Sequence, residues 1–402
     1  MTQKLLKPEN KVVLPDDYQR YTDKYFTRSR EILEGEGINP EVSLKVFARG
    51  EGKIVGLNEA VDIFEKYRSD LSENGGEVWV TKKNEFETKE PLMIVRGPAQ
   101  DVVEMETMYL GVLSHNLTEK HPDYEIPTEE QFQREVERVT DIYDEVEVPL
   151  LYFGARHYHW SQDEEFGRAA LKAGAVQTST DAGSTYIGEN GVGTTPHFLT
   201  IVLADQYGPD EATLKTAQLF DEHIDEEVSR VTLVDTFNEE IDDSLKIAEY
   251  FNGKYGDDWK HKFRVDTCGE NIAQGGEEFD PHRGKYETGR GVRIEPVKKL
   301  RDRLIDEGYG DNTEIILSSG FGDPEKARAF VEAQKKYREK SRKEFGKYYD
   351  LFSAIGAGAF TDGIHCTSDI YEVNGRPLAK TGREVDPEEM NHYMEKNMKR
   401  VI

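Results

Sequence analysis

From residue 148 onward the sequence alternates short apolar segments with amphipathic ones, and this alternation limits the chain to few folds. Because the apolar residues in each short segment are consecutive, we expect strands that are covered on both faces. Repeated strand–helix units of this kind predict a parallel sheet or an α/β barrel. The predicted strands are "VPLLYFGAR", "VTLVDTF", "KFRVDT", "EIILSSGFG" and "LFSAIGAG", and the helical patterns between them include "EEFGRAALKAGA", "NEEIDDSLKIAEYF", "RIEPVKKLRDRLIDEG" and "DPEKARAFVEAQ".

Two predicted helix starts support this phasing. Ser161 and Glu164 have the spacing of a capping box. Asp323 and Pro324 give an N-cap followed by proline at the first helical position.

The first part of the chain has a different pattern, in which "EVSLKVFAR", "GEVWV" and "PLMIVRG" read as strands. Residues 57–71 and a segment from Val102 to Val112 have helical spacing. A chain of 402 residues exceeds one comfortable core, so we expect two domains. We predict an N-terminal α+β domain over residues 1–147, completed by the C-terminal segment 365–402, and an α/β barrel over residues 148–364.

Charge and cysteine usage restrict the partners and the compartment. A formal net charge of -27 disfavours nucleic acid and anionic membranes, because both would be repelled. The two cysteines, Cys268 and Cys366, suggest neither a disulfide framework nor a metal site. No segment approaches the ~18 to 20 apolar residues that a membrane span needs. We expect a soluble cytoplasmic protein that holds any phosphate ligand with local dipoles and a few arginines.

Polar residues and glycines gather where the predicted strands end, which is the edge where α/β barrels bind ligands. Arginine side chains there suit a carboxylate or a phosphate, or else form ion pairs with the neighbouring aspartates. The aspartates could bind ribose hydroxyls or magnesium, or could orient the arginines. Glycine loops can hold phosphate through their backbone N–H groups, and the alternative is a tight turn. These residues are Arg156, Asp235, Arg264, Asp266, Gly320, Gly322, Gly356 and Gly358.

Histidines offer two further candidates. His197 follows "GVGTTP", where small residues would let a phosphate approach, although capping or packing is the more common role of a lone histidine. His157 and His159 share one face of a strand end, but no further ligand is evident, so we expect no metal site. The long polar stretch 268–291 is predicted to be a loop near the active site.

The ordered set "TDKYF", "EPLMIVRGP", "FGARH", "TSTDAGS", "GVGTTPH", "TLVDTF", "FRVDT", "SSGFGD", "AIGAGAF" and "TSDIYEVNGRPLAK" resembles the nicotinate phosphoribosyltransferases over most of the chain. This resemblance implies a type II phosphoribosyltransferase layout, with an α+β domain on an irregular α/β barrel and active sites shared in a dimer. The chain departs from the family at "DTCGEN", where an Asp-Ser-Gly-like run is usual.

The resemblance also implies an activity: phosphoribosyl transfer from 5-phosphoribosyl 1-pyrophosphate (PRPP) to nicotinate, with Mg²⁺ and with ATP hydrolysis through a phosphohistidine. His197 would be that histidine, and Tyr25 would stack on the pyridine ring, reaching over from a partner subunit. Arg156 would bind the nicotinate carboxylate or PRPP, and Arg264 the pyrophosphate or the ring face. Asp266 would bind the ribose hydroxyls or magnesium, and Thr195 and Asp235 would bind the substrate. The 5′-phosphate would be held by Ser319, Gly320, Gly322, Gly356 and Gly358. Lys380 matches a family position to which no role is assigned.

Three alternatives remain open from the sequence. Nicotinamide or quinolinate could be the base, although the second carboxylate of quinolinate would demand a denser cluster of Arg and Lys than Arg156 and its histidine neighbours provide. A non-catalytic phosphosugar-binding protein on the same fold would keep the glycine loops. An unrelated phosphosugar isomerase or aldolase barrel would need a Glu or Lys base at a strand end, and none is evident.

Overall fold

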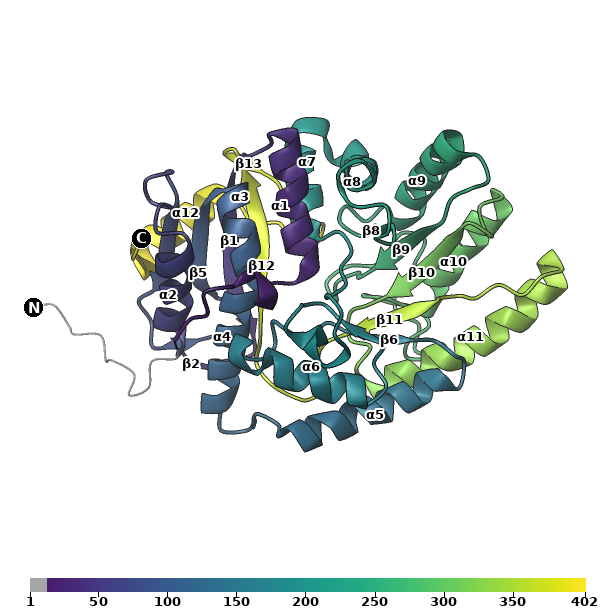
Figure 1. Cartoon of the computed structure of the whole chain (residues 1–402), viewed down its shortest axis with the longest axis horizontal. Coiled ribbons are helices and arrows are strands. Elements are labelled where there is room, and N and C mark those ends of the chain that lie inside the picture. Colours follow the sequence, from purple (N-terminus) through teal and green to yellow (C-terminus); the bar gives the residue numbers. More distant parts are fainter. Residues whose placement is uncertain (1–12) are drawn as a thin grey trace, which may run out of the picture.

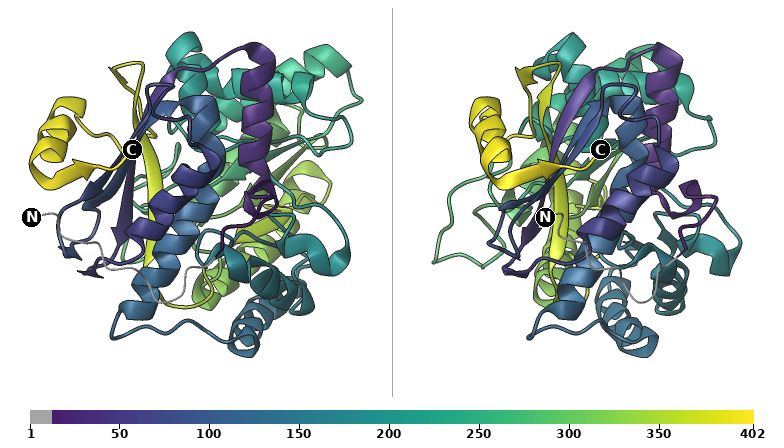
Figure 2. Two further views of the ribbon diagram at one scale, coloured as in Figure 1. Left: turned by 60° about the vertical axis from the view of Figure 1, so that its left-hand side comes forward. Right: turned by 90° about the vertical axis from the view of Figure 1, so that its left-hand side faces the viewer.

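The computed structural model describes residues 13–402. It contains an antiparallel sheet beside a parallel one (Figure 1). The antiparallel sheet has six strands, in the order β13 (Arg376–Pro377), β12 (His365–Val373), β1 (Glu41–Arg49), β5 (Pro91–Pro98), β3 (Glu77–Thr81) and β14 (Met398–Arg400). Figure 2 shows the C-terminal segment, in yellow, lying against the strands of the N-terminal part. This sheet therefore joins segments from both ends of the chain.

The helices of this first part bury the apolar faces that the sequence pattern predicts. One large apolar cluster combines residues of β1 and β5 with helices α1, α2 and α4, and α12 packs on Ile94 and Tyr371 in a separate small cluster. The bounds are α1 (Lys24–Glu36), α2 (Leu57–Tyr67), α3 (Ala99–Val102), α4 (Glu106–Lys120) and α12 (Pro387–Asn397), with a two-stranded sheet of β2 (Gly52–Lys53) and β4 (Glu85–Phe86).

The parallel sheet also has six strands, and its helices cover its outer side (Figure 1). The order is β7 (Gln177–Thr178), β6 (Leu150–Tyr152), β11 (Ala354–Ala357), β10 (Thr313–Leu317), β9 (His261–Val265) and β8 (Val231–Leu233). The helices of this part are α5 (Glu129–Asp144), α6 (Asp163–Lys172), α7 (His197–Tyr207), α8 (Pro209–His223), α9 (Glu240–Tyr255), α10 (Ile294–Asp306) and α11 (Pro324–Phe345). Helix α7 does not cover the sheet, because its buried residues pack in the apolar cluster of the first part. The sheet is curled, with β7 and β8 at its edges. The predicted fold, an irregular α/β barrel with an N-terminal α+β domain, is confirmed.

The predicted helix starts had different outcomes. Asp323 caps α11 through its side chain, which accepts a hydrogen bond from the Glu325 N–H, and Pro324 is the first helical residue, as expected. The predicted capping box of Ser161 and Glu164 is wrong. Helix α6 begins at Asp163 after an N-cap, Gln162, that makes no side-chain bond, because a short 3₁₀ turn (Trp160–Gln162) precedes it.

Other predictions concern boundaries and membrane segments. The division of the chain at residues 147 and 364 stays a prediction, and residues 1–12 of the predicted first domain lie outside the described residues. Among the helices of residues 13–402, none combines the length and the apolar character that crossing a membrane requires.

Candidate active site

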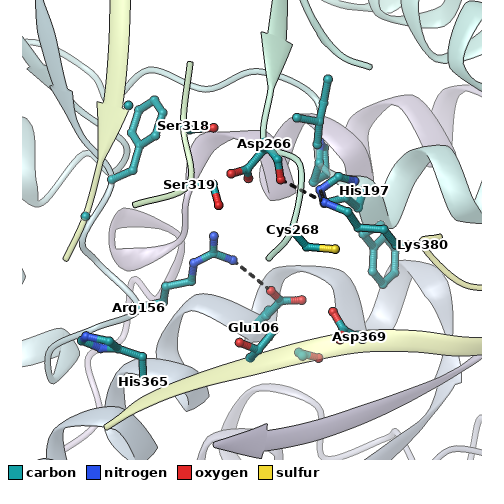
Figure 3. Close-up of a pocket in the computed structure, with 18 of the residues that line it drawn as sticks. Glu106, Arg156, His197, Asp266, Cys268, Ser318, Ser319, His365, Asp369 and Lys380 are labelled. Carbon is teal, nitrogen blue, oxygen red and sulfur yellow. Dashed lines mark hydrogen bonds and ion pairs between the residues drawn. The ribbon is translucent and has the colours of Figure 1, made fainter. Parts of the chain in front are cut away.

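A cavity of about 480 Å³ lies between the carboxyl ends of the parallel strands and the antiparallel sheet (Figure 3). The parallel sheet contributes the residues that follow β6, β9, β10 and β11, as expected for an α/β barrel. Strand β12 and the first residues of α1 and α4 form the opposite wall. Predicted site residues that line this cavity are Tyr25, Arg156, His197, Arg264, Asp266, Ser319, Gly320, Gly322, Gly356 and Gly358.

The cavity is basic, although the whole chain is acidic. Its lining has five cationic side chains, Arg49, Arg156, Arg264, Lys380 and Arg383, and three carboxyl groups, Glu106, Asp266 and Asp369. The formal charge of the chain is -27. Such a local reversal of sign concentrates anionic ligands at the cavity.

Arg264 and Asp266 hold each other in place at the end of β9. The buried Arg264 guanidinium donates to Asp266 Oδ2 at 2.8 Å, to Ser318 Oγ at 2.9 Å and to Thr194 Oγ1 at 3.1 Å. It also lies over the ring of Phe153. The ion pair with Asp266 that the sequence left open for Arg264 is therefore present. Arg264 orients Asp266, whose other carboxyl oxygen has no hydrogen bond within residues 13–402.

Arg156 is the least committed cation of the cavity. Its only ion pair in the described part of the chain is with Glu106, at 3.6 Å between Nη1 and a carboxyl oxygen, and it makes no hydrogen bond there. Figure 3 shows the two side chains pointing toward one another. Burial raises the pKa of Glu106 to about 8, although Arg156 acts in the opposite direction. At neutral pH the Glu106 carboxyl is mostly uncharged, so the Arg156 charge remains available to an anionic ligand.

Tyr25 reaches this cavity from the start of α1 in its own chain. Its ring is buried and its hydroxyl donates to Asp23 Oδ2 at 3.2 Å. Burial raises the pKa of Tyr25 well above its usual value, so the hydroxyl stays protonated. Whether a partner subunit also contributes to the cavity stays a prediction.

His197 is the first residue of α7, a helix whose following residues "FLTIVLA" are all buried. A helix that is apolar on all sides is held firmly in a core, and this fixes its N-terminus at the cavity. Burial lowers the pKa of His197 well below its usual value, and the charge of Lys380 lowers it further. The imidazole is therefore neutral at physiological pH.

Lys380 links His197 to two aspartates. Its Nζ donates to His197 Nε2 at 2.7 Å, to Asp235 Oδ2 at 2.5 Å and to the Asp266 carbonyl oxygen at 3.2 Å. Because an ammonium group can only donate, Nε2 is the accepting nitrogen. The imidazole proton is then on Nδ1, which donates to Thr236 Oγ1 at 3.0 Å.

Two of the predicted substrate-binding residues do not line the cavity. Asp235 is buried behind Lys380 and also accepts from the Asp266 N–H at 3.1 Å. Thr195 is buried and accepts from the Leu233 N–H at 3.0 Å, which ties the "GTTPH" segment to β8. Both residues position groups that do line the cavity.

The loop that follows β10 offers free backbone donors. Within residues 13–402, the N–H groups of Ser319, Gly320, Phe321 and Gly322 have no hydrogen-bond acceptor. Ser319 and Gly320 both have positive φ, of 78° and 76°, a conformation that is costly for serine and typical of functional loops. Lys326, on α11, donates to the Ser319 carbonyl oxygen at 2.7 Å and so stabilises the loop. Since Asp323 already caps α11, the loop amides rather than the helix end are available to an anion.

The glycines of the two loops serve different purposes. At Gly356 and Gly358 a Cβ atom would lie 2.3 Å from the ring or the carbonyl oxygen of Phe153, so these two glycines allow close packing. Gly322 packs the first loop on the second, because a Cβ there would lie 1.9 Å from the Ala359 carbonyl oxygen. Only Gly320 has open space beside it, and its positive φ explains the glycine.

Gly322→Ala is expected to separate the two glycine loops, since a backbone carbonyl cannot move aside cheaply. We expect a loss of about 1 to 3 kcal/mol of unfolding free energy from this overpacking, measured by urea denaturation. Gly253→Ala is the matched control, because that helical position in α9 has nothing within 4 Å. Equal stability of Gly322→Ala and the unsubstituted protein would contradict the packing role.

Several lining residues escaped sequence reasoning, namely Arg49, Glu106, His365, Asp369 and Arg383. A carboxyl group amid the buried residues of "VEMETMYLGVL" was a usable signal for Glu106, because unpaired acidic residues are rarely buried. The others come from β12, the end of β1 and the C-terminal segment, and no local pattern marks them. Within the 268–291 stretch, Cys268 and Gly269 line the cavity. His159 bonds to Glu59 and Ser161.

Comparison with known proteins agrees with this architecture. Residues 23–116 match the family model of the quinolinate phosphoribosyl transferase N-terminal domain. The structure is similar to a putative nicotinate phosphoribosyltransferase from Saccharomyces cerevisiae, with 15% identity, a TM-score of 0.64 and coverage of 94% of this chain and 97% of that chain. It is also similar to a nicotinate phosphoribosyltransferase from Vibrio cholerae, with 13% identity, a TM-score of 0.62 and coverage of 94% of this chain and 92% of that chain. A nicotinate phosphoribosyltransferase from Porphyromonas gingivalis is similar as well, with 15% identity, a TM-score of 0.60 and coverage of 94% of this chain and 98% of that chain. These likenesses confirm the predicted type II phosphoribosyltransferase fold.

Proposed function

We propose that this protein is a nicotinate phosphoribosyltransferase, which joins the phosphoribosyl group of PRPP to the ring nitrogen of nicotinate and releases pyrophosphate. The observation that carries the proposal is the basic cavity in an acidic chain, with one uncommitted guanidinium and a loop of free amides facing it. Both substrates are anions, and the cavity offers each a distinct receptor. The names of the structural neighbours above support this choice.

The substrates would be divided between the two halves of the cavity. The amides of Ser319 to Gly322 would hold the 5′-phosphate, and Asp266 would accept hydrogen bonds from the ribose hydroxyls. Arg156 would bind the nicotinate carboxylate beside the ring of Tyr25. Arg49 and Arg383, on the opposite side of the cavity lining, would face the pyrophosphate.

The reaction itself needs position more than proton transfer. The lone pair of the pyridine nitrogen attacks C1 of the ribose, and the bond from C1 to the pyrophosphate oxygen breaks. The ring nitrogen of nicotinate is already unprotonated near neutral pH, so no general base is required. Positive charge develops on the ribose in the transition state, and the fixed Asp266 carboxylate stabilises it.

Mg²⁺ fits this site as an ion held jointly with the substrate. Among residues 13–402, one cluster of three side chains could by itself hold a metal ion, and it consists of Glu36, Glu222 and His223. None of these three residues lines the cavity. Asp266 does line it and has one carboxyl oxygen without a hydrogen bond among the described residues, and Mg²⁺ is commonly held by one or two carboxylates together with substrate phosphates. Asp266 would hold the ion, which would neutralise charge on the departing pyrophosphate.

The coupling to ATP would pass through His197. Its Nε2 would attack the γ-phosphorus of ATP, and the bond from that phosphorus to the ADP oxygen would break. Thr236 holds the tautomer that leaves the Nε2 lone pair available, and Lys380, which now donates to Nε2, would turn to the phosphoryl oxygens. Asp235 keeps the ammonium group of Lys380 in place throughout.

Quinolinate is the second candidate base, because the matching family model is that of a quinolinate enzyme. Its additional carboxylate would need a further cation besides Arg156, and besides Arg49 and Arg383, which would leave their carboxylate partners for the pyrophosphate. The other cavity cations are already paired: Arg49 with Glu270, Arg264 with Asp266, Lys380 with Asp235, and Arg383 with Asp369. Nicotinate, which needs only Arg156, therefore fits better.

The testing experiment supplies purified protein with PRPP and Mg²⁺ and one base at a time, nicotinate, nicotinamide or quinolinate, with and without ATP. We expect nicotinate mononucleotide, formed faster with ATP. If quinolinate is the only base that gives a product, the second candidate is favoured. PRPP binding without product from any base would favour a phosphosugar-binding protein. A cytoplasmic location and a homodimer with shared sites complete the proposal.

A further inference from the structure

Glu106 occupies an unusual place in the cavity. It begins α4, its side chain is buried, and its carboxyl group makes no hydrogen bond within residues 13–402. Its ion pair within residues 13–402 is with Arg156, at 3.6 Å, a distance too long for a hydrogen bond. A carboxyl group with free lone pairs, facing the one uncommitted guanidinium of the cavity, is placed to touch the same ligand group as Arg156.

The groups around Glu106 come from four elements. Asp23 and Asp369, from the start of α1 and from β12, both raise the pKa of Glu106, and Arg156, after β6, lowers it. Tyr25 on α1 and Tyr109 on α4 are both protonated, since burial raises the pKa of each well above its usual value. Burial is the largest influence on Glu106 and brings its pKa to about 8. The protonated form therefore dominates at neutral pH.

We infer that Glu106 is a specificity-determining residue, whose protonated carboxyl donates a hydrogen bond to the carboxylate of nicotinate beside Arg156. This inference rests on the proposed function. A carboxylic acid kept neutral by an apolar site can act as a donor. In the ionised form, Glu106 repels the nicotinate carboxylate and pairs with Arg156, while it accepts a hydrogen bond from the N–H of a neutral carboxamide. The acid and the amide are thus distinguished by one proton on the enzyme.

Three histidines line the cavity and do not change charge between about pH 6.5 and 9.5. Burial lowers the pKa of His157, His197 and His365, so these rings stay neutral. Lys326, below the glycine loop, has its pKa lowered to about 7 by burial and loses its charge early in this range. A variant at Glu106 separates the two titrations, because Lys326 is unchanged in it.

The test is calorimetric binding of nicotinate and of nicotinamide to the full-length protein and to Glu106→Gln at about pH 6.5 and pH 9.5. With a pKa of about 8 for Glu106, nicotinate affinity of the unsubstituted protein should fall about 30-fold across this range. Nicotinamide affinity should not fall. Glutamine keeps an N–H donor and cannot ionise, so the nicotinate affinity of Glu106→Gln should change less than about threefold over the same pH range. Glu59→Gln, a carboxyl outside the cavity that pairs with His159, is the matched control and should behave like the unsubstituted protein.

Turnover of nicotinate and PRPP, followed in the same samples, separates the role of Glu106 from the proposed transferase activity. Nicotinate binding that depends on Glu106 in a protein that forms no product would keep this inference and reject the proposed transferase. Product formation with the same fall in nicotinate affinity in Glu106→Gln would overturn the role of Glu106 and leave the transferase intact. Absence of nicotinate binding by the unsubstituted protein at the lower pH would overturn the inference.

Discussion

Arg156→Ala is expected to raise the KM for nicotinate by about 100-fold, because charge-assisted hydrogen bonds worth about 3 kcal/mol in total are lost. The KM for nicotinamide, a neutral pyridine, should change much less. Steady-state kinetics with each base gives this comparison directly. The effect is large because Arg156 alone among the cavity cations has no hydrogen bond to another described residue, and its ion-pair partner Glu106 is mostly uncharged at neutral pH.

Two controls accompany this variant. Arg156→Lys keeps the charge but loses the planar fork, so an intermediate KM is expected. Arg168→Ala removes a partly exposed arginine that pairs with Glu129 outside the cavity, and its kinetics should match the unsubstituted protein. An unchanged preference between nicotinate and nicotinamide in Arg156→Ala would remove Arg156 from carboxylate recognition.

His197→Ala is expected to abolish the stimulation by ATP while a slow transfer without ATP persists. The imidazole would be the phosphoryl acceptor, whereas the pyridine and phosphate receptors, Arg156 and the loop after β10, remain in place. Rates with and without ATP measure the effect, and transfer of ³²P from γ-labelled ATP to the protein measures the acceptor directly. His392→Ala, at an exposed position on α12, is the control and should retain both signals.

Equal loss of rate with and without ATP in His197→Ala would contradict the phosphohistidine role. It would instead assign His197 to holding Lys380, to which it is bonded. Thermal unfolding of the variant checks that α7 stays in the core, where its apolar side chains rather than His197 anchor it.

Much of the fold could be predicted because local patterns and the final packing agree. Strand β1 has the predicted bounds, and every parallel strand except β7, which was not predicted, overlaps its predicted apolar segment. The predicted capping box at Ser161 is wrong because two residues in suitable spacing do not fix where a helix begins when a 3₁₀ turn can precede it. Helix α7 gives no amphipathic signal, since "HFLTIVLA" packs on all sides.

The site could be predicted only in part, because its walls come from distant segments. Strand ends marked Arg156, Arg264 and Asp266, since parallel strands bring their carboxyl ends to one edge. Nothing local relates these residues to Lys380 or Arg383, which the C-terminal segment carries back to the cavity. Spacing also cannot tell a glycine that packs on Phe153 from one with positive φ, so the separate roles of Gly358 and Gly320 needed the structure.

Competition between the three bases tests whether this cavity transfers a phosphoribosyl group to nicotinate. Purified protein receives limiting PRPP, Mg²⁺ and ATP with nicotinate, nicotinamide and quinolinate at equal concentration in one vessel, and the products are separated by chromatography. Nicotinate mononucleotide is expected to dominate, because Arg156 with a neutral Glu106 matches a single carboxylate. A dominant product from quinolinate or nicotinamide, or PRPP left unconsumed, would contradict this expectation.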